Sequence, residues 1–126
     1  MKKIIKTNKA PGAVGPYSQA VVSGGYVFTS GQLPVDPQTG KFVEGGIKEE
    51  ARQCLENVRE ILEAAGTSLD KAVKATVFLT DINDFSAVNE IYGTFFKEDP
   101  PARSAYQVAA LPLGARIEIE MIASIE

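Results

Sequence analysis

The chain of 126 residues contains no histidine. Histidine is the usual general base near neutral pH and the commonest zinc ligand, so its absence excludes Ser-His-Asp and Cys-His catalytic arrangements and most zinc sites. Only one cysteine is present, Cys54, which excludes an intrachain disulfide. A lone thiol is typical of a reducing compartment, and we therefore expect a cytoplasmic protein.

Long apolar runs and basic clusters are also missing. No segment approaches the ~20 apolar residues that a membrane-spanning helix needs. Residues 1–12 lack the apolar stretch of a secretory signal. The net charge is −3, and no run of Lys or Arg follows the pair at residues 2–3. Because nucleic-acid binders usually present a basic stripe, we expect no nucleic-acid partner. Because long apolar runs are missing, we expect no membrane association.

What is present is typical of a globular protein, with 44% hydrophobic and 23% charged residues. The length predicts a single domain over residues 1–126. Apolar periodicity predicts helices at 47–65, ended by Gly66, and from about 85 to 97. Cys54 lies in the apolar stripe of the first helix and is expected in the core. Strands are predicted at 3–5, 19–22, 26–30, 72–80, 104–108 and 116–125.

Two helices can cover only one face of a sheet of about six strands, which indicates an α+β architecture. The last predicted strand alternates between an apolar face and a face that carries Glu118 and Glu120. The apolar face should meet the helices. The other face would remain open with apolar and acidic residues together, and we expect a closed homo-oligomer to cover it.

The strongest candidate for chemistry is Arg103, which follows two prolines at the start of a predicted strand. A guanidinium fork with a fixed direction suits a planar carboxylate. If the strands at 104–108 and 117–125 form a hairpin, Glu118 lies close to Arg103. Two interpretations remain open: a partly buried ion pair, or a site in which Arg103 holds a substrate carboxylate and Glu118 holds a water.

Two polar residues in other segments are weaker candidates. Asn89 lies at the edge of the apolar arc of the second helix, where it could bond a nearby loop or face a ligand. Ser30 ends a predicted strand and has no base beside it in sequence, so it suits a hydrogen-bond donor better than a nucleophile. No phosphate-binding glycine loop, nucleophile elbow or EF-hand spacing is present.

Several motifs together resemble the RidA/YjgF family over essentially the whole chain, in the order and spacing of that family. They are GPYSQA at 15–20, TSGQLP at 29–34, VN at 88–89, PARS at 101–104, LP at 111–112 and IEIE at 117–120. The resemblance implies a chorismate-mutase-like α+β fold, with a mixed sheet of about six strands and two helices on one face. It also implies a homotrimer with clefts between the subunits.

The activity implied by the resemblance is hydrolysis of 2-imino acids and their enamines, such as 2-aminoacrylate, 2-iminopropanoate and 2-iminobutanoate, to 2-oxo acids and ammonia. No cofactor is implied. Arg103 would bind the substrate carboxylate and Glu118 would activate the attacking water. Backbone groups of Gly31 and Ala105 would bind the imine end and the water. The remaining residues implied to line the pocket are Tyr17, Ser30 and Asn89.

Two positions depart from the common family pattern. Ala105 stands where many members carry cysteine, which argues against thiol chemistry in the pocket. Tyr106 is bulkier than the usual aliphatic residue and could change the pocket wall. A non-catalytic module that binds small carboxylates would use the same arginine and is the main alternative function. RNA cleavage, ascribed to some members of the resembled family, conflicts with the missing basic stripe.

Overall fold

The computed structural model describes residues 1–126, and its strands follow the alternation of apolar and polar side chains. The six strands are β1 (Lys3–Ile5), β2 (Ala20–Ser23), β3 (Tyr26–Thr29), β4 (Ala72–Leu79), β5 (Ala102–Gln107) and β6 (Ile117–Ser124). The two α-helices are α1 (Ile47–Ala64) and α2 (Phe85–Phe95). The predicted number of strands and helices is confirmed. No helix has both the length and the apolar character needed to cross a membrane.

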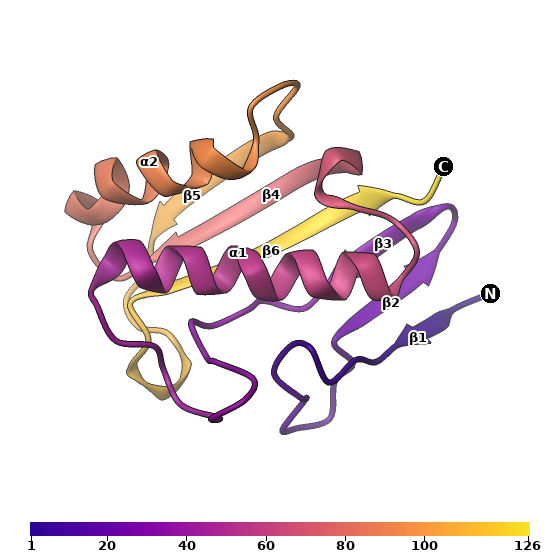
Figure 1. Cartoon of the computed structure of the whole chain (residues 1–126), viewed down its shortest axis with the longest axis horizontal. Coiled ribbons are helices and arrows are strands. Elements are labelled where there is room, and N and C mark those ends of the chain that lie inside the picture. The colour runs from indigo at the N-terminus through magenta and orange to yellow at the C-terminus, as the bar shows by residue number, and fades with distance from the viewer.

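All six strands form one mixed sheet in the order β1-β2-β3-β6-β4-β5 (Figure 1). Neighbouring strands are antiparallel except β4 and β5, which are parallel. Helix α2 makes the crossover between β4 and β5, as parallel neighbours require. Helix α1 connects β3 to β4. In the sheet, the last strand, β6, lies between these two strands. The C-terminal strand is therefore central to the sheet.

Both helices lie on the same face of the sheet (Figure 1). Helix α1 buries one stripe of apolar side chains there: Ala51, Cys54, Leu55, Val58, Ile61 and Leu62. The matching face of β6 is equally buried: Ile117, Ile119, Met121 and Ala123. Burial of each larger aliphatic side chain contributes about 1.5–3 kcal/mol. The prediction that the apolar face of the last strand meets the helices is confirmed.

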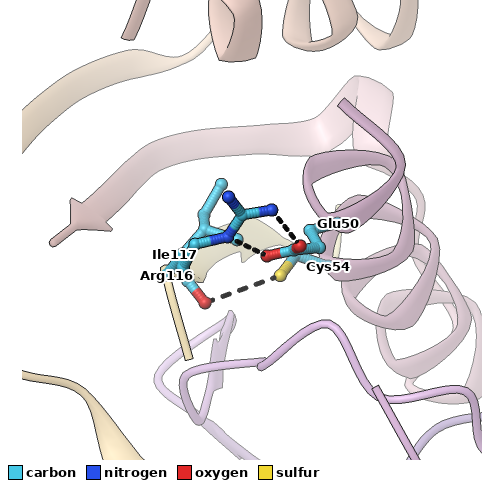
Figure 2. A network of polar contacts seen from close by, with 4 residues as sticks. All are labelled: Glu50, Cys54, Arg116 and Ile117. Atoms are coloured by element: carbon cyan, nitrogen blue, oxygen red, sulfur yellow. Dashed lines mark hydrogen bonds and ion pairs between the residues drawn. The ribbon is translucent and has the colours of Figure 1, made fainter. Parts of the chain in front are cut away.

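Cys54 belongs to this core, as its place in the helical stripe predicts. The residue has no exposed surface, and its thiol makes a long contact of 4.0 Å with the carbonyl oxygen of Ile117 (Figure 2). Burial raises the pKa of the Cys54 thiol well above its ordinary value, with the nearby carboxylate of Glu118 as the next cause. The thiol therefore stays protonated and packs as a small apolar group.

The hairpin between β2 and β3 fixes the register of the first half of the sheet. Ser23 pairs with Tyr26, which leaves a two-residue turn of Gly24 and Gly25. Both glycines have positive φ, 62° and 84°, the conformation that a primed hairpin turn requires. The chain then continues past β3 to Gln32, which forms an isolated bridge with Ile119 of β6.

Strand β4 departs from simple alternation at its start. Alternation with the buried Ala75, Val77 and Leu79 would bury Val73, but Val73 is 44% exposed and Ala72 is buried instead. The register of β4 against β6 shifts between Ala72 and Lys74, which is a β-bulge. A bulge inserts one residue into a strand and therefore reverses the faces of the residues before it.

The second face of the sheet has no helix over it and carries apolar side chains with large exposed fractions. They include Ile4 at 51%, Phe28 at 43% and Tyr106 at 54%. The register places Ile4, Val21, Phe28 and Ile122 in one row across four strands. This surface, called the open face below, also carries Glu118 and Glu120.

Candidate functional site

Arg103 lies on β5, the edge strand, and its side chain points toward α2. Its register partner on β4 is Ala75, which is fully buried on the helix-covered face. Arg103 Nη1 donates a 2.7 Å hydrogen bond to Asn89 Oδ1. The guanidinium carbon also lies over two rings of α2, 5.0 Å from the centroid of Phe85 and 4.7 Å from that of Tyr92. Arg103 is therefore half-buried in a defined orientation.

The charge of Arg103 is not neutralised within the chain. The other three arginines form ion pairs with glutamates: Arg52 with Glu49, Arg59 with Glu56, and Arg116 with Glu50. Figure 2 shows the last of these pairs, in which Nε and Nη2 of Arg116 both donate to the carboxylate. Arg103 has no acidic partner, and its Nε and Nη2 donate to no group of the chain. These donors remain available for an anion.

The backbone of β5 adds further polar groups beside Arg103. The N–H of Val108 donates to the carbonyl oxygen of Leu79 on β4 at 2.7 Å. Because successive strand residues direct their backbone groups to opposite edges, the N–H and C=O of Ala105 point to the free edge of β5. Ala105 pairs with Val77 and shares the helix-covered face with Arg103.

Glu118 lies in a second group of polar residues, on the open face. Its neighbour across the strands is Gly31, where an added Cβ would lie only 2.7 Å from Glu118 Cδ. A side chain at this position would displace the carboxylate, so glycine allows Glu118 to lie against the backbone here. The backbone is held there by two hydrogen bonds between Gln32 and Ile119, of 2.8 and 3.1 Å.

Burial raises the pKa of Glu118 above its ordinary value of 4.5, and the like charge of Glu120 on the same face raises it further. Both effects disfavour the ionised form. A carboxyl with a raised pKa accepts and returns a proton nearer to neutral pH than an ordinary carboxyl does. Glu118 therefore binds a proton more tightly than an ordinary carboxyl does.

Ser30 and Tyr17 extend this second group. Ser30 Oγ donates to the carbonyl oxygen of Ser18 at 2.5 Å, and the Ser30 N–H donates to the carbonyl oxygen of Gln19 at 2.9 Å. These bonds connect the loop of Tyr17 to the end of β3. The Tyr17 side chain is 49% exposed, and its hydroxyl accepts a long bond of 3.4 Å from the N–H of Val14.

The expected hairpin between the strands of Arg103 and Glu118 is wrong. Strand β4 lies between β5 and β6, and the two residues point to opposite faces of the sheet. The reason is topological, because β5 pairs in parallel with β4 through a helical crossover and β6 returns on the other side. The interpretation of Arg103 and Glu118 as an ion pair within one chain is excluded.

The other expectations have mixed outcomes. Asn89 makes no hydrogen bond to a loop, because its Oδ1 accepts from Arg103 Nη1. That Asn89 faces a ligand stays a prediction. Tyr106 points to the open face and stacks on Phe78, with ring centroids 6.5 Å apart. Sequence reasoning missed the two aromatic contacts of Arg103. Their signal was present in the spacing of Phe85, Asn89 and Tyr92, which puts all three on one stripe of α2.

The chain has no group of three or more His, Cys, Asp or Glu side chains that could hold a metal ion. Fold and site together define an α+β protein with two helices on one face of a six-stranded mixed sheet. It carries an unpaired arginine at the sheet edge and a half-buried carboxyl on the open face.

Comparisons with known proteins identify the family. The family model for endoribonuclease L-PSP matches residues 7–125, and the chain belongs to this family, the RidA/YjgF family. Human 2-iminobutanoate/2-iminopropanoate deaminase is 57% identical over 123 residues, which cover 98% of this chain and 90% of the human protein. The family resemblance seen in the sequence motifs is thus confirmed.

Solved structures agree with the observed fold. RidA from the Antarctic bacterium Psychrobacter is 51% identical, with a TM-score of 0.94 over 98% of this chain and 99% of that protein. Escherichia coli TdcF, solved with bound serine, is 51% identical, with a TM-score of 0.93 over 97% of this chain and 98% of that protein. The α+β fold predicted from the sequence is confirmed at the level of one mixed sheet and two helices.

Proposed function

We propose that this protein hydrolyses 2-imino acids and their enamine tautomers to 2-oxo acids and ammonia. Its substrates would include 2-aminoacrylate, 2-iminopropanoate and 2-iminobutanoate. The human relative named as a 2-iminobutanoate/2-iminopropanoate deaminase supports this reaction class. The observation that carries the proposal is Arg103, a half-buried arginine that is firmly held but not neutralised.

The proposed role of Arg103 is to bind the substrate carboxylate. Two charge-assisted hydrogen bonds to a planar carboxylate match the guanidinium fork. Such a bond contributes about 1.5–3 kcal/mol when the donor is charged. The serine bound in Escherichia coli TdcF is itself a small carboxylate, which supports this ligand class.

The proposed role of Glu118 is to activate water. The water oxygen attacks the iminium carbon while Glu118 accepts a proton, which gives a tetrahedral carbinolamine. Glu118 then returns the proton to the nitrogen, the C–N bond breaks and ammonia leaves, and Glu118 accepts the hydroxyl proton as the C=O bond forms. General base catalysis of this kind contributes about 10²–10⁴-fold. The raised pKa of Glu118 supports the role.

The remaining candidates would complete the pocket. Backbone groups of Gly31 and Ala105 would bind the imine end and the water. Side chains would line the pocket from three further positions: Tyr17, Ser30 and Asn89. The free edge of β5 beside Ala105 and the close packing of Gly31 on Glu118 support these assignments.

We further propose that the active assembly is a homotrimer of the chorismate-mutase-like type, with sites between subunits. Arg103 and Glu118 lie on opposite faces of one sheet, so one chain alone does not bring them together. A site would then combine the Arg103 group of one subunit with the Glu118 group of its neighbour. Exposed apolar side chains on the open face supply the surface that packs between subunits.

The proposal extends to the setting of the protein. Residues 1–126 would act as one domain in the cytoplasm, without a cofactor, a nucleic-acid partner or a membrane. The net charge of −3 supports the expectation about nucleic acid. An RNA-cleaving function would instead require activity that survives replacement of Arg103 in protein free of contaminating nuclease.

The reaction is tested by supplying the imine directly. An amino-acid dehydratase and its substrate generate the imine in the presence of semicarbazide, which traps what has not been hydrolysed. Addition of the protein should lower the yield of trapped imine in proportion to its concentration. A trapped yield that stays the same while the protein is folded and trimeric would refute the proposed reaction.

One observation favours a second candidate, a non-catalytic binding module for 2-oxo acids. The Arg103 group is assembled within one chain and does not need Glu118 to hold its orientation. Titration with 2-oxobutanoate separates the two functions. Binding without any acceleration of imine hydrolysis supports the module, and binding together with turnover supports the enzyme.

A further inference from the structure

The side chains that hold Arg103 form one stripe along α2. Phe85, Asn89 and Tyr92 are spaced i, i+4 and i+7, so they lie above one another on the same side of the helix. All three contact the guanidinium of Arg103: two rings at 5.0 and 4.7 Å from its carbon, and the amide oxygen at 2.7 Å from Nη1. These three contacts of the guanidinium therefore all come from a single helix.

This stripe holds the cation with neutral groups only. Aromatic faces carry partial negative charge and attract a guanidinium without a formal counter-ion. Burial raises the pKa of Tyr92, although the positive charge of Arg103 opposes the shift, so the phenol stays neutral. An acid in the same place would also orient Arg103, but it would cancel the charge that an incoming anion needs.

The hydroxyl and the ring of Tyr92 differ in what they contact. It is buried and has no hydrogen-bond partner. A buried hydroxyl without a partner destabilises the fold, so the hydroxyl does not explain how Tyr92 stabilises its surroundings. The ring, in contrast, packs on Phe96 at 4.8 Å between centroids and faces Arg103 on another side.

We propose that Phe85 and Tyr92 are positioning residues that keep the Arg103 guanidinium in place and thereby set the preference of the site for a carboxylate. With the rings over the guanidinium and one N–H of Nη1 bonded to Asn89, Nε, Nη2 and the second N–H of Nη1 are left to meet a ligand. Without the rings, the arginine samples other rotamers, and the charged donors are no longer in place for a carboxylate. This inference rests on the proposed function, because it takes a carboxylate as the ligand of Arg103.

The chain offers a matched control on the same helix. Phe95 is also half-buried against the core, and its ring lies 5.5 Å from the guanidinium carbon of Arg59. Phe85→Leu and Phe95→Leu each remove one ring that faces an arginine and each leave an apolar side chain. They should cost similar stability, but only Phe85→Leu changes the arginine of the proposed site.

The experiment measures the Kd of 2-oxobutanoate by calorimetry on the assembled protein, with thermal unfolding as the measure of stability. We expect Phe85→Leu to weaken binding about tenfold, the range of a partly desolvated cation–π contact. The KM for imine should rise by a similar factor while kcat changes by less than about twofold. Binding of the neutral analogue 2-oxobutanamide should not change. Phe95→Leu should bind 2-oxobutanoate as the unmodified protein does.

Two variants of Tyr92 give a second test. Tyr92→Phe keeps the ring and removes the unpartnered hydroxyl, so its affinity should equal that of the unmodified protein. Tyr92→Leu should weaken carboxylate binding as Phe85→Leu does. Equal affinity in the Phe85→Leu and Phe95→Leu proteins, or a loss with Tyr92→Phe, would overturn the inference. Failure of the unmodified protein to bind 2-oxobutanoate would instead contradict the proposed function itself.

Discussion

Two arginines of this protein reach from a strand to a helix, and they do so in opposite electrostatic settings. Arg116 lies just before β6 and donates from two nitrogens to Glu50 on α1 (Figure 2). Arg103 lies on β5 and contacts an amide oxygen and two rings on α2. In the first case an acid satisfies the charge. In the second case the charge is oriented and left available.

The difference lies in the partner and not in the arginine itself, because a carboxylate neutralises Arg116 whereas neutral groups hold Arg103. The hydrogen bond to Glu50 is the main cause that raises the pKa of Arg116, and it stabilises the ion pair at a half-exposed position. Because the Arg116 side chain is 48% exposed to water, the pair contributes only about 1 kcal/mol or less to stability, although Glu50 is only 13% exposed. The neutral partners of Arg103 instead leave its charge without a counter-ion within the chain.

The largest expected effect comes from removing the unneutralised charge. Arg103→Ala should lower kcat/KM for 2-iminobutanoate by about 10²–10⁴-fold, because two charge-assisted bonds to the carboxylate are lost. Arg116→Ala is the matched control and should change kcat/KM by less than about twofold. Steady-state kinetics on both variants checks the contrast. Equal losses in the two variants would remove the distinction between the arginines.

The next effect concerns the acid on the open face. Glu118→Gln should lower kcat by about 10²-fold or more and leave the Kd of 2-oxobutanoate unchanged, because Gln cannot accept the proton from water. The rate of the unmodified protein should fall as the pH drops through the raised pKa of Glu118, since the base becomes protonated. A rate that stays flat across this range would argue against Glu118 as the base.

Glu118→Gln should also change how the stability of the protein depends on pH. The raised pKa means that the folded protein binds the Glu118 proton more tightly than the unfolded chain does. The stability that the folded protein gains from this proton is fully present below the ordinary pKa of a glutamate. It is lost as the pH rises through the raised pKa of Glu118. The stability of Glu118→Gln relative to the unmodified protein should therefore increase with pH in that window, as measured by denaturant unfolding.

A smaller effect on ligand binding is expected when Arg103 is given an acidic partner, as Arg116 has in Glu50. Asn89→Asp places a carboxylate 2.7 Å from Nη1 without a change in side-chain size. The new ion pair should weaken binding of 2-oxobutanoate by about tenfold, because the arginine is already neutralised. Asn83→Asp is the control for net charge, since Asn83 is exposed and contacts no arginine. If Asn89→Asp bound as tightly as this control, neutrality around Arg103 would have no function.

The reverse change should have the smallest effect. Glu50→Gln leaves Arg116 without its counter-ion, as Arg103 is in the unmodified protein. We expect a loss of about 1 kcal/mol or less in the free energy of unfolding, because Arg116 is half-exposed and water solvates it. Catalysis should be unchanged. Chemical denaturation and steady-state kinetics on the same preparation measure both quantities.

Much of the fold was predictable because local patterns are strong in this chain. The alternation in β6 and the stripe in α1 assign core residues without knowledge of any contact. The hairpin at Gly24 and Gly25 follows from the conformations open to glycine. The exposure of Val73 was not predictable from alternation, because a bulge depends on the partner strand, which the pattern of a single strand does not contain.

The candidate site was predictable only in part. Arg103 and Glu118 were identified, but their relation was wrong because the pairing of β5 with β4 joins segments separated by a helix. The aromatic partners of Arg103 were visible only as an apolar stripe. Spacing alone does not distinguish a ring that packs in the core from a ring that faces a cation.

By itself, the sequence determined the elements, the buried stripe of each, and the classes of chemistry open to a chain without histidine. It also contained the motifs that carry the family membership. Only the tertiary structure decided that Arg116 meets Glu50 while Arg103 meets neutral groups, and that Glu118 faces the other side of the sheet. The physical reason is that local periodicity sets which face of an element is apolar. Which charges then come together depends on strand order, a property of the whole chain.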